Sequence, residues 1–268
     1  MPKEAPSITS TLASLASLSS TRSPAPLKIH FPTTNTTVSS PGVHLTKEAT
    51  SPSPIYSISA SALSHLTFPN CDLSPSTSAS TESSLSSASA STSALQSGQA
   101  SASAGRRRSS GISLRPDPAQ LHSQPRYMVV ALDLDAPFPS VPLMAPLLHG
   151  VQADLVLSTD EIDEGEEYIP LEVASLDSAE GYGECVNHVV DYIGPSPPPT
   201  SSPHRYMFML WEQPRGLTRA RIAEEVKLGN GYGHGDHMGI KGRARWDQEG
   251  FEKRLGLERV VGGNYFVC

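Results

Sequence analysis

The chain has 268 residues and a formal net charge of -7. This acidic balance argues against a general nucleic-acid binder, which needs a basic surface. No run of about eighteen apolar residues occurs, so no transmembrane segment is expected. The three cysteines, Cys71, Cys185 and Cys268, are far apart in the sequence. This pattern favours free thiols in a reducing compartment over a disulfide framework.

Residues 1–26 are predicted to form a tail with a short amphipathic helix. Apolar side chains recur there near helical spacing, at Ile8, Leu12, Leu15 and Leu18. The segment lacks the uninterrupted apolar core of a signal peptide, so a cytoplasmic protein is expected.

Residues 71–124 consist mostly of Ser, Ala and Thr. Such a stretch buries too little apolar surface to offset the entropy of ordering it. We therefore expect a disordered insertion that divides one folded domain into residues 27–70 and 125–268. The basic cluster Arg106-Arg-Arg108, just before two serines, fits either a basophilic kinase site or a solvated linker.

Short apolar segments predict many strands and few helices. Residues 127–132 and 206–211 are continuous apolar runs, typical of strands covered on both faces. Further strands are predicted at residues 27–31, 55–58, 186–193 and 263–267, and another segment begins at residues 147–150 and continues through residues 153–157. Helices are predicted at residues 217–228 and 251–255, and a solvated acidic loop at residues 160–167. With 24 prolines in the chain, this pattern indicates a mainly β domain.

Polar side chains gather where two of the apolar strands begin or end. Asp133 and Asp135 lie two residues apart, so strand alternation points both carboxylates to one face. His204 and Tyr206 share a face in the same way, and His149 begins another strand. Taken alone, aspartates before a proline turn are more often turn formers than ligands, and a lone histidine is more often structural.

If these faces converge, they form a site for an anion. A neighbouring carboxylate favours a protonated histidine, which can donate to a phosphate or carboxylate ligand. The prolines of residues 194–198 would add a rigid wall with few competing backbone donors. The expected site is therefore a small, preformed pocket.

Two segments in this order resemble the phosphatidylethanolamine-binding protein (PEBP) family. They are Ala131-Leu-Asp-Leu-Asp-Ala-Pro137 and Gly194-Pro-Ser-Pro-Pro-Pro-Thr-Ser-Ser-Pro-His-Arg-Tyr206. They resemble the family's Asp-Pro-Asp-Ala-Pro turn and its Gly-x-Pro-Pro-x-x-x-His-Arg-Tyr segment. Leu148-His-Gly150, Trp211-Glu-Gln213 and the final strand after Gly262 are also similar to family segments. The pattern looks most like fungal intracellular members related to the yeast carboxypeptidase Y inhibitor.

The resemblance implies an antiparallel β-sandwich with a few peripheral helices. It implies a ligand-binding set of Asp133, Asp135, His149, Pro197, Pro198, His204 and Tyr206. The implied ligand is an anionic small molecule or a phospholipid headgroup, and the implied protein partner is a protease or kinase. Neither a cofactor nor a metal ion is expected, since the glycine-rich segment around His234 is better interpreted as a surface loop.

The chain departs from the family pattern in three places. Leu134 stands where the family has a proline between the aspartates, and the loop from the prolines to His204 is longer. The sequence ends at Cys268 without the C-terminal helix that borders the pocket in animal members. A more open pocket, or an altered ligand, is therefore expected.

An enzyme is the alternative. Some family members in fungal secondary metabolism take part in dimerising maleic-anhydride units, and His149 or His204 would then act as general acid or base. No nucleophile elbow or catalytic triad is apparent in the sequence. A third interpretation is a scaffold that uses the Ser-rich tract as a phosphorylation-regulated tether.

Overall fold

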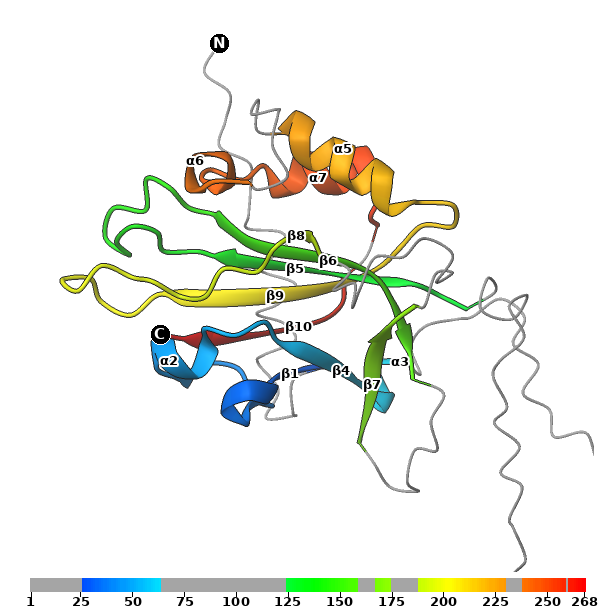
Figure 1. The fold of residues 1–268 in the computed structure, drawn as a ribbon, viewed down its shortest axis with the longest axis horizontal. Helices are drawn as coiled ribbons and strands as arrows, with labels where there is room; N and C mark the ends of the chain where they lie inside the picture. Colours follow the sequence, from blue (N-terminus) through cyan, green and yellow to red (C-terminus); the bar gives the residue numbers. More distant parts are fainter. Residues whose placement is uncertain (1–25, 64–123, 159–166, 175–187, 230–237, 259) are drawn as a thin grey trace, which may run out of the picture. The chain divides into compact units, whose positions relative to one another are not determined.

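The computed structural model describes residues 26–63, 124–158, 167–174, 188–229, 238–258 and 260–268 (Figure 1). All of these residues fall within one compact unit. The helix predicted near residue 8, almost all of the Ser-rich insertion, the acidic loop and the segment around His234 lie outside the described residues. The boundaries proposed for the two parts of the domain stay a prediction.

Ten strands form one hydrogen-bonded sheet. Along the sheet the order is β2-β1-β4-β7-β6-β5-β9-β10-β3, with β8 paired to β6 beside β7. Every pairing is antiparallel except that of β10 with β3. The strands are β1 (Leu27–Phe31), β2 (Thr36–Val38), β3 (Val43–His44), β4 (Ile55–Ser59), β5 (Tyr127–Asp133), β6 (Leu147–Leu157), β7 (Tyr168–Val173), β8 (His188–Val190), β9 (Arg205–Glu212) and β10 (Val260–Val267). The predicted mainly β architecture is confirmed.

Helices cover one face of the central strands. α5 (Arg219–Gly229), α6 (Ile240–Arg243) and α7 (Gln248–Leu255) lie together on one side of the sheet (Figure 1). Alternate residues of β5, namely Met128, Val130 and Leu132, share a buried apolar cluster with side chains of α5 and α7. The remaining helices are short: η1 (Pro32–Thr34), α2 (Lys47–Thr50) and α3 (Ala60–Leu63). No described helix is long and apolar enough to cross a membrane.

The opposite face of β5 and β9 packs against β1, β4 and β10 through aromatic rings. Phe208 of β9 lies 6.1 Å from Tyr56 and 5.9 Å from Phe266 between ring centroids. Asn264 of β10 donates from Nδ2 to the carbonyls of Leu27 and Val38, at 2.8 and 3.0 Å. The sheet therefore curves back on itself, so that β10 contacts β1 and β2. The sandwich description holds approximately, because the two layers belong to one continuous sheet.

Two of the sequence predictions need correction. Residues 186–193 were expected to form one strand, but among the described residues only His188–Val190 do so. Beyond them the pairing with β6 becomes irregular, although Ile193 N–H still donates to the carbonyl of His149 on β6 at 2.9 Å. β7 was not predicted, because Pro170 interrupts the strand pattern and prolines are uncommon inside paired strands.

Candidate anion-binding site

A buried aspartate–histidine pair lies where β5 and β9 meet. Asp133 is the last residue of β5 and is paired with Tyr206 of β9. His204 precedes Tyr206 by two residues, so its ring reaches the same face. Asp133 Oδ2 lies 2.8 Å from His204 Nδ1, and both side chains are almost fully buried. This pair forms the centre of the candidate site.

The second ring nitrogen of His204 also has neighbours. His204 Nε2 lies 2.9 Å from the hydroxyl of Ser201 and 3.1 Å from the carbonyl oxygen of Pro137. A carboxylate and a carbonyl can only accept hydrogen bonds. The arrangement therefore suits a His204 ring that carries a proton on each nitrogen.

Asp135 has a different partner from Asp133. Its carboxylate accepts from Arg205 Nε at 2.8 Å and from Nη2 at 2.7 Å, in a bidentate pair. It also accepts the backbone N–H of Arg205 at 2.8 Å. Burial raises the pKa of Asp135, but the hydrogen bonds and charge of Arg205 outweigh burial and hold that pKa below its usual value. β5 ends at Asp133, so strand alternation does not extend to Asp135.

Asp133 also forms the turn that follows β5. Its Oδ1 accepts the backbone N–H of Asp135 at 2.8 Å, while Oδ2 faces His204. All four carboxylate oxygens of Asp133 and Asp135 thus have donors within the protein. These two residues hold His204, Arg205 and the turn in place.

His149 is positioned by a β-bulge. Ala131 pairs with Gly150 and Leu132 pairs with Leu148, so His149 is the extra residue of β6. Bulges re-aim side chains in this way, often beside functional sites. His149 Nδ1 donates to the carbonyl of Ile193 at 2.6 Å, which leaves Nε2 buried without a partner among the described residues. Burial lowers the pKa of His149, so the neutral ring presents Nε2 as an acceptor.

Tyr206 stands between the two histidines. Its ring meets His149 edge-on at a centroid distance of 5.1 Å and stacks on Phe266 at 5.4 Å. Its hydroxyl is buried and, like His149 Nε2, has no hydrogen-bond partner in the described part of the chain. Burial, the charge of Asp133 and the closeness of the hydroxyl to the Asp133 carboxylate raise the pKa of Tyr206, so the phenol keeps its proton and can donate. The hydroxyl makes no well-aligned hydrogen bond to that carboxylate, whose two oxygens already face other donors.

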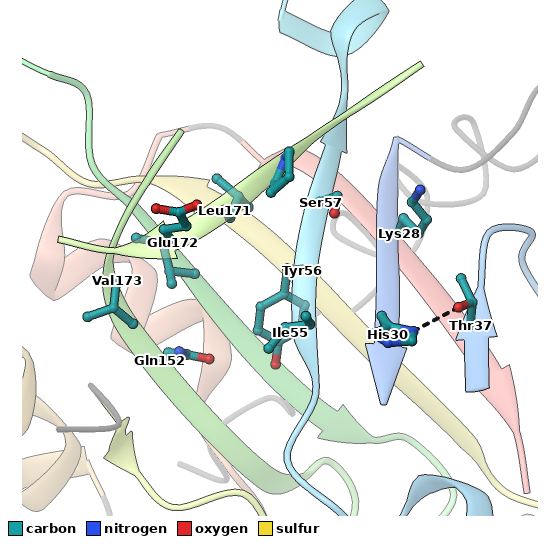
Figure 2. Close-up of a pocket in the computed structure, with 12 residues that line it drawn as sticks. Lys28, His30, Thr37, Ile55, Tyr56, Ser57, Gln152, Leu171, Glu172 and Val173 are labelled. Atoms are coloured by element: carbon teal, nitrogen blue, oxygen red, sulfur yellow. Dashed lines mark hydrogen bonds between the residues drawn. The ribbon is translucent and has the colours of Figure 1, made fainter. Parts of the chain in front are cut away.

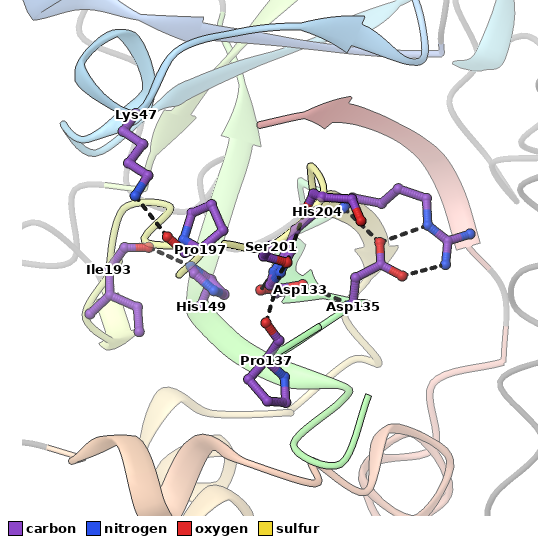
Figure 3. Close-up of polar contacts among 11 residues, drawn as sticks. Lys47, Asp133, Asp135, Pro137, His149, Ile193, Pro197, Ser201 and His204 are labelled. Carbon is purple, nitrogen blue, oxygen red and sulfur yellow. Dashed lines mark hydrogen bonds and ion pairs between the residues drawn. The ribbon is translucent and has the colours of Figure 1, made fainter. Parts of the chain in front are cut away.

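The proline segment lies on the His149 side of the aspartate–histidine pair (Figure 3). Lys47 Nζ of α2 donates to the carbonyl of Pro197 at 2.8 Å, and the carbonyl of Pro198 accepts from Ser201 N–H at 2.9 Å. A Cβ on Gly194 would come within 2.7 Å of the Ser51 backbone, so this close approach requires glycine.

This segment contacts both histidines of the site. Ile193 at one end binds His149, and Ser201 at the other binds His204. The side chains of Asp133, Asp135, His149, His204 and Tyr206 are each buried. Among the described residues these contacts enclose the Asp133–His204 pair, and the more open pocket stays a prediction.

A family model for phosphatidylethanolamine-binding proteins matches residues 85–265, more than half of the chain. The chain belongs to the phosphatidylethanolamine-binding protein family. The Carboxypeptidase Y inhibitor of Saccharomyces cerevisiae is 29% identical over 126 residues, which make up 46% of this chain and 52% of that protein. The match therefore spans about half the length of that inhibitor.

Two solved structures of the family can be superposed on the chain. Carboxypeptidase Y inhibitor complexed with its cognate proteinase gives a TM-score of 0.49 at 17% identity, covering 96% of this chain and 91% of that one. A phosphatidylethanolamine-binding protein from Plasmodium vivax gives 0.31 at 17% identity, covering 53% and 62%. Because both TM-scores lie below 0.5, neither superposition adds to the family assignment.

In this PEBP-family chain, three residues that support the site were not predicted from the sequence. Ser201 contacts His204, Lys47 holds the proline segment, and buried Arg243 of α6 donates from Nη1 to the carbonyl of His149 at 3.0 Å. Ser201 precedes His204 by three residues, a spacing that was available in the sequence. Lys47 and Arg243 are distant in sequence from their partners, so no local pattern points to them.

The family's aromatic-Glu-Gln motif has a structural role here. Gln213 Oε1 accepts the backbone N–H of Asp154 at 2.6 Å, and Arg126 Nη1 lies 3.1 Å from Asp154 Oδ1. Asp154 has φ of 56° at a second irregularity of β6. Gln213 therefore stabilises the strained end of the strand that carries His149.

Proposed function

We propose that this PEBP-family chain binds a small anion through His149 and Tyr206. The observation that carries the proposal is the pair of buried polar atoms, His149 Nε2 and Tyr206 Oη, that have no partner among the described residues. Buried polar groups are nearly always hydrogen-bonded, so a ligand is a reasonable source of the missing partners. Asp133 and Asp135 act as positioning residues, because their oxygens are already bonded and carboxylates repel anions.

The hydrogen-bond pattern defines the ligand. Tyr206 offers a donor, whereas neutral His149 offers an acceptor at Nε2, because its Nδ1 proton is bound to Ile193. A ligand that both accepts and donates fits the pair: hydrogen phosphate, the monoanion of a phosphate monoester such as phosphoethanolamine, or a half-ionised dicarboxylic acid. An anion without a proton, such as sulfate, would first require His149 to be protonated.

A ligand also has to reach a closed site. The hydroxyl that contacts His204 Nε2 belongs to Ser201, which is half-buried, whereas His204 is buried. A ligand oxygen could replace that hydroxyl as the partner of His204. Pro197, which is buried, and Pro198, which is half-buried, would then restrict the ligand to a small size.

Calorimetric titration tests this proposal. Phosphate, phosphoethanolamine and maleate are titrated into the full chain, its Tyr206→Phe and His149→Gln variants, and the surface control Glu224→Gln. Loss of one hydrogen bond to a charged ligand should weaken binding about tenfold or more in each site variant and leave the control unchanged. Absence of binding of all three anions to the unsubstituted chain would refute the proposal.

A second candidate function is inhibition of a carboxypeptidase. It is favoured by the 29% identity to the carboxypeptidase Y inhibitor, although the match covers 52% of that protein. The test is hydrolysis of a peptide by carboxypeptidase Y with increasing amounts of the full chain. Dose-dependent inhibition is expected, and unchanged hydrolysis at a large excess of the chain would contradict it. The kinase partner and the maleic-anhydride enzyme stay predictions, without a favouring observation among the described residues.

A further inference from the structure

A groove lies where the pairing of β7 with its neighbours β4 and β6 ends. The last pairs of β7 join Leu171 to Tyr56 of β4 and Val173 to Leu155 of β6. Ile55 and Gln152 lie beyond those pairs, on the two strands that β7 no longer connects. The groove at this place has a volume of about 500 Å³, and Figure 2 shows its lining residues. Sites for small molecules usually have volumes of roughly 300–1,000 Å³.

One polar atom of the groove has no partner. Gln152 lines the groove and is 9% exposed, and its Oε1 is buried without a hydrogen-bond partner in the described residues. In Figure 2 the amide of Gln152 lies on the same side of the groove as Val173 and is directed toward Tyr56. An unpaired buried acceptor is unfavourable, so a donor brought by a ligand would stabilise the complex.

The remaining lining is mostly apolar. Ile55 is 53% exposed, a large value for an isoleucine, and Leu171 and Val173 line the groove beside it. The ionisable groups at the groove are of mixed sign: Lys28, whose ammonium lies 4.5 Å from the centroid of the Tyr168 ring, and the exposed Glu172. His30 is bound to the hydroxyl of Thr37 at 2.9 Å. This balance favours a neutral ligand over an anion.

We infer that the groove is a second binding site, for a compact neutral apolar molecule with one N–H or O–H donor for Gln152. Its volume suits a small molecule rather than a helix. The groove shares no residue with the aspartate–histidine site, and a neutral donor-bearing ligand differs in chemistry from the anion proposed there. A negative binding result at one site therefore does not bear on the other site.

A matched pair of probes tests the inference. Indole carries an N–H donor, and N-methylindole has the same ring system without it. Each is titrated into the ¹⁵N-labelled full chain, and the backbone amide shifts are followed by NMR. Indole should shift the resonances of Ile55, Gln152 and Val173, and N-methylindole should bind about fivefold or more weakly, as expected for loss of one hydrogen bond.

Three variants separate the possible outcomes. Gln152→Met should bind both probes with the same affinity, Ser57→Trp should fill the groove and bind neither, and Leu143→Ser, outside the groove, should behave as the unsubstituted chain. A well-dispersed spectrum verifies that each variant is folded. The inference is overturned if indole shifts no groove resonance up to its solubility limit, if it shifts the His149 and His204 region instead, or if the unsubstituted chain does not distinguish the probes.

Discussion

The imidazole of His149 meets the phenol ring of Tyr206 edge-on, with the ring centroids 5.1 Å apart. The outer polar atom of each ring is buried and has no hydrogen-bond partner in the described part of the chain. Two such atoms on neighbouring rings are unusual in a folded protein, because each is taken out of water without compensation. A ligand would supply the missing partners. Loss of either atom should therefore weaken ligand binding more than it lowers the free energy of unfolding.

Replacing Tyr206 by phenylalanine tests whether its hydroxyl contributes to binding rather than to stability. The change removes a buried hydroxyl without a partner, so the free energy of unfolding should stay within about 1 kcal/mol of the original value or rise. Phosphate affinity should fall in the same variant. Urea unfolding and calorimetry measure the two quantities. A loss of more than about 2 kcal/mol of stability would mean that the hydroxyl bonds to the protein itself.

Replacing Asp133 by alanine should be strongly destabilising. The change leaves buried His204 without its carboxylate partner and removes the acceptor for Asp135 N–H. Breaking one side of a buried ion pair costs about 3–5 kcal/mol. The surface control Glu224→Ala should stay within about 0.5 kcal/mol. Equal stabilities of the two variants in urea unfolding would contradict the central role of the Asp133–His204 pair.

The stability of the ligand-free protein should decrease as the pH falls below about 6.5. Burial lowers the pKa of His149 and that of His188 below the ordinary value of 6.5. Between the lowered pKa and 6.5 the unfolded chain binds protons that the folded chain does not, so acidification favours unfolding. Urea midpoints at about pH 7.5 and about pH 5.5 should show the decrease, and His149→Gln should reduce it. A midpoint independent of pH would contradict a buried neutral His149.

Sulfate binding should respond to pH in the opposite direction. Sulfate has no proton to donate, so it requires protonated His149, whereas hydrogen phosphate can donate to the neutral ring. Calorimetric sulfate affinity should therefore rise as the pH is lowered through the range in which His149 gains its proton. His149→Gln should abolish this rise. Equal sulfate affinity at about pH 7.5 and about pH 5.5 would exclude His149 as the pH-sensitive contact.

Replacing Asn264 by alanine should weaken the contact of β10 with β1 and β2. Its amide donates to two buried carbonyls, one on β1 and one on β2. Leaving both carbonyls without a donor should cost about 2–4 kcal/mol. Hydrogen exchange should then accelerate selectively in β1 and β2. An unchanged unfolding free energy would show that these strands are held by other contacts.

Local sequence patterns predicted most of the sheet. The apolar runs at residues 127–132 and 206–211 correspond to β5 and β9, and the helical spacing within residues 217–228 located α5. Strand alternation also placed His204 and Tyr206 on one face, because side-chain direction depends only on the strand itself. The pattern failed for residues 191–193 and for β7, where tertiary contacts and a proline override local preference.

The sequence by itself determined the family, the mainly β class and the residues that gather at the site. The tertiary structure alone decided what each of them contacts. Asp135 binds Arg205, and the bulge that turns His149 toward Tyr206 depends on how Gly150 and Leu148 align with β5. Lys47 reaches Pro197 from 150 positions away. The physical reason is that side-chain direction follows local backbone geometry, whereas partners depend on the register between strands that are distant in sequence.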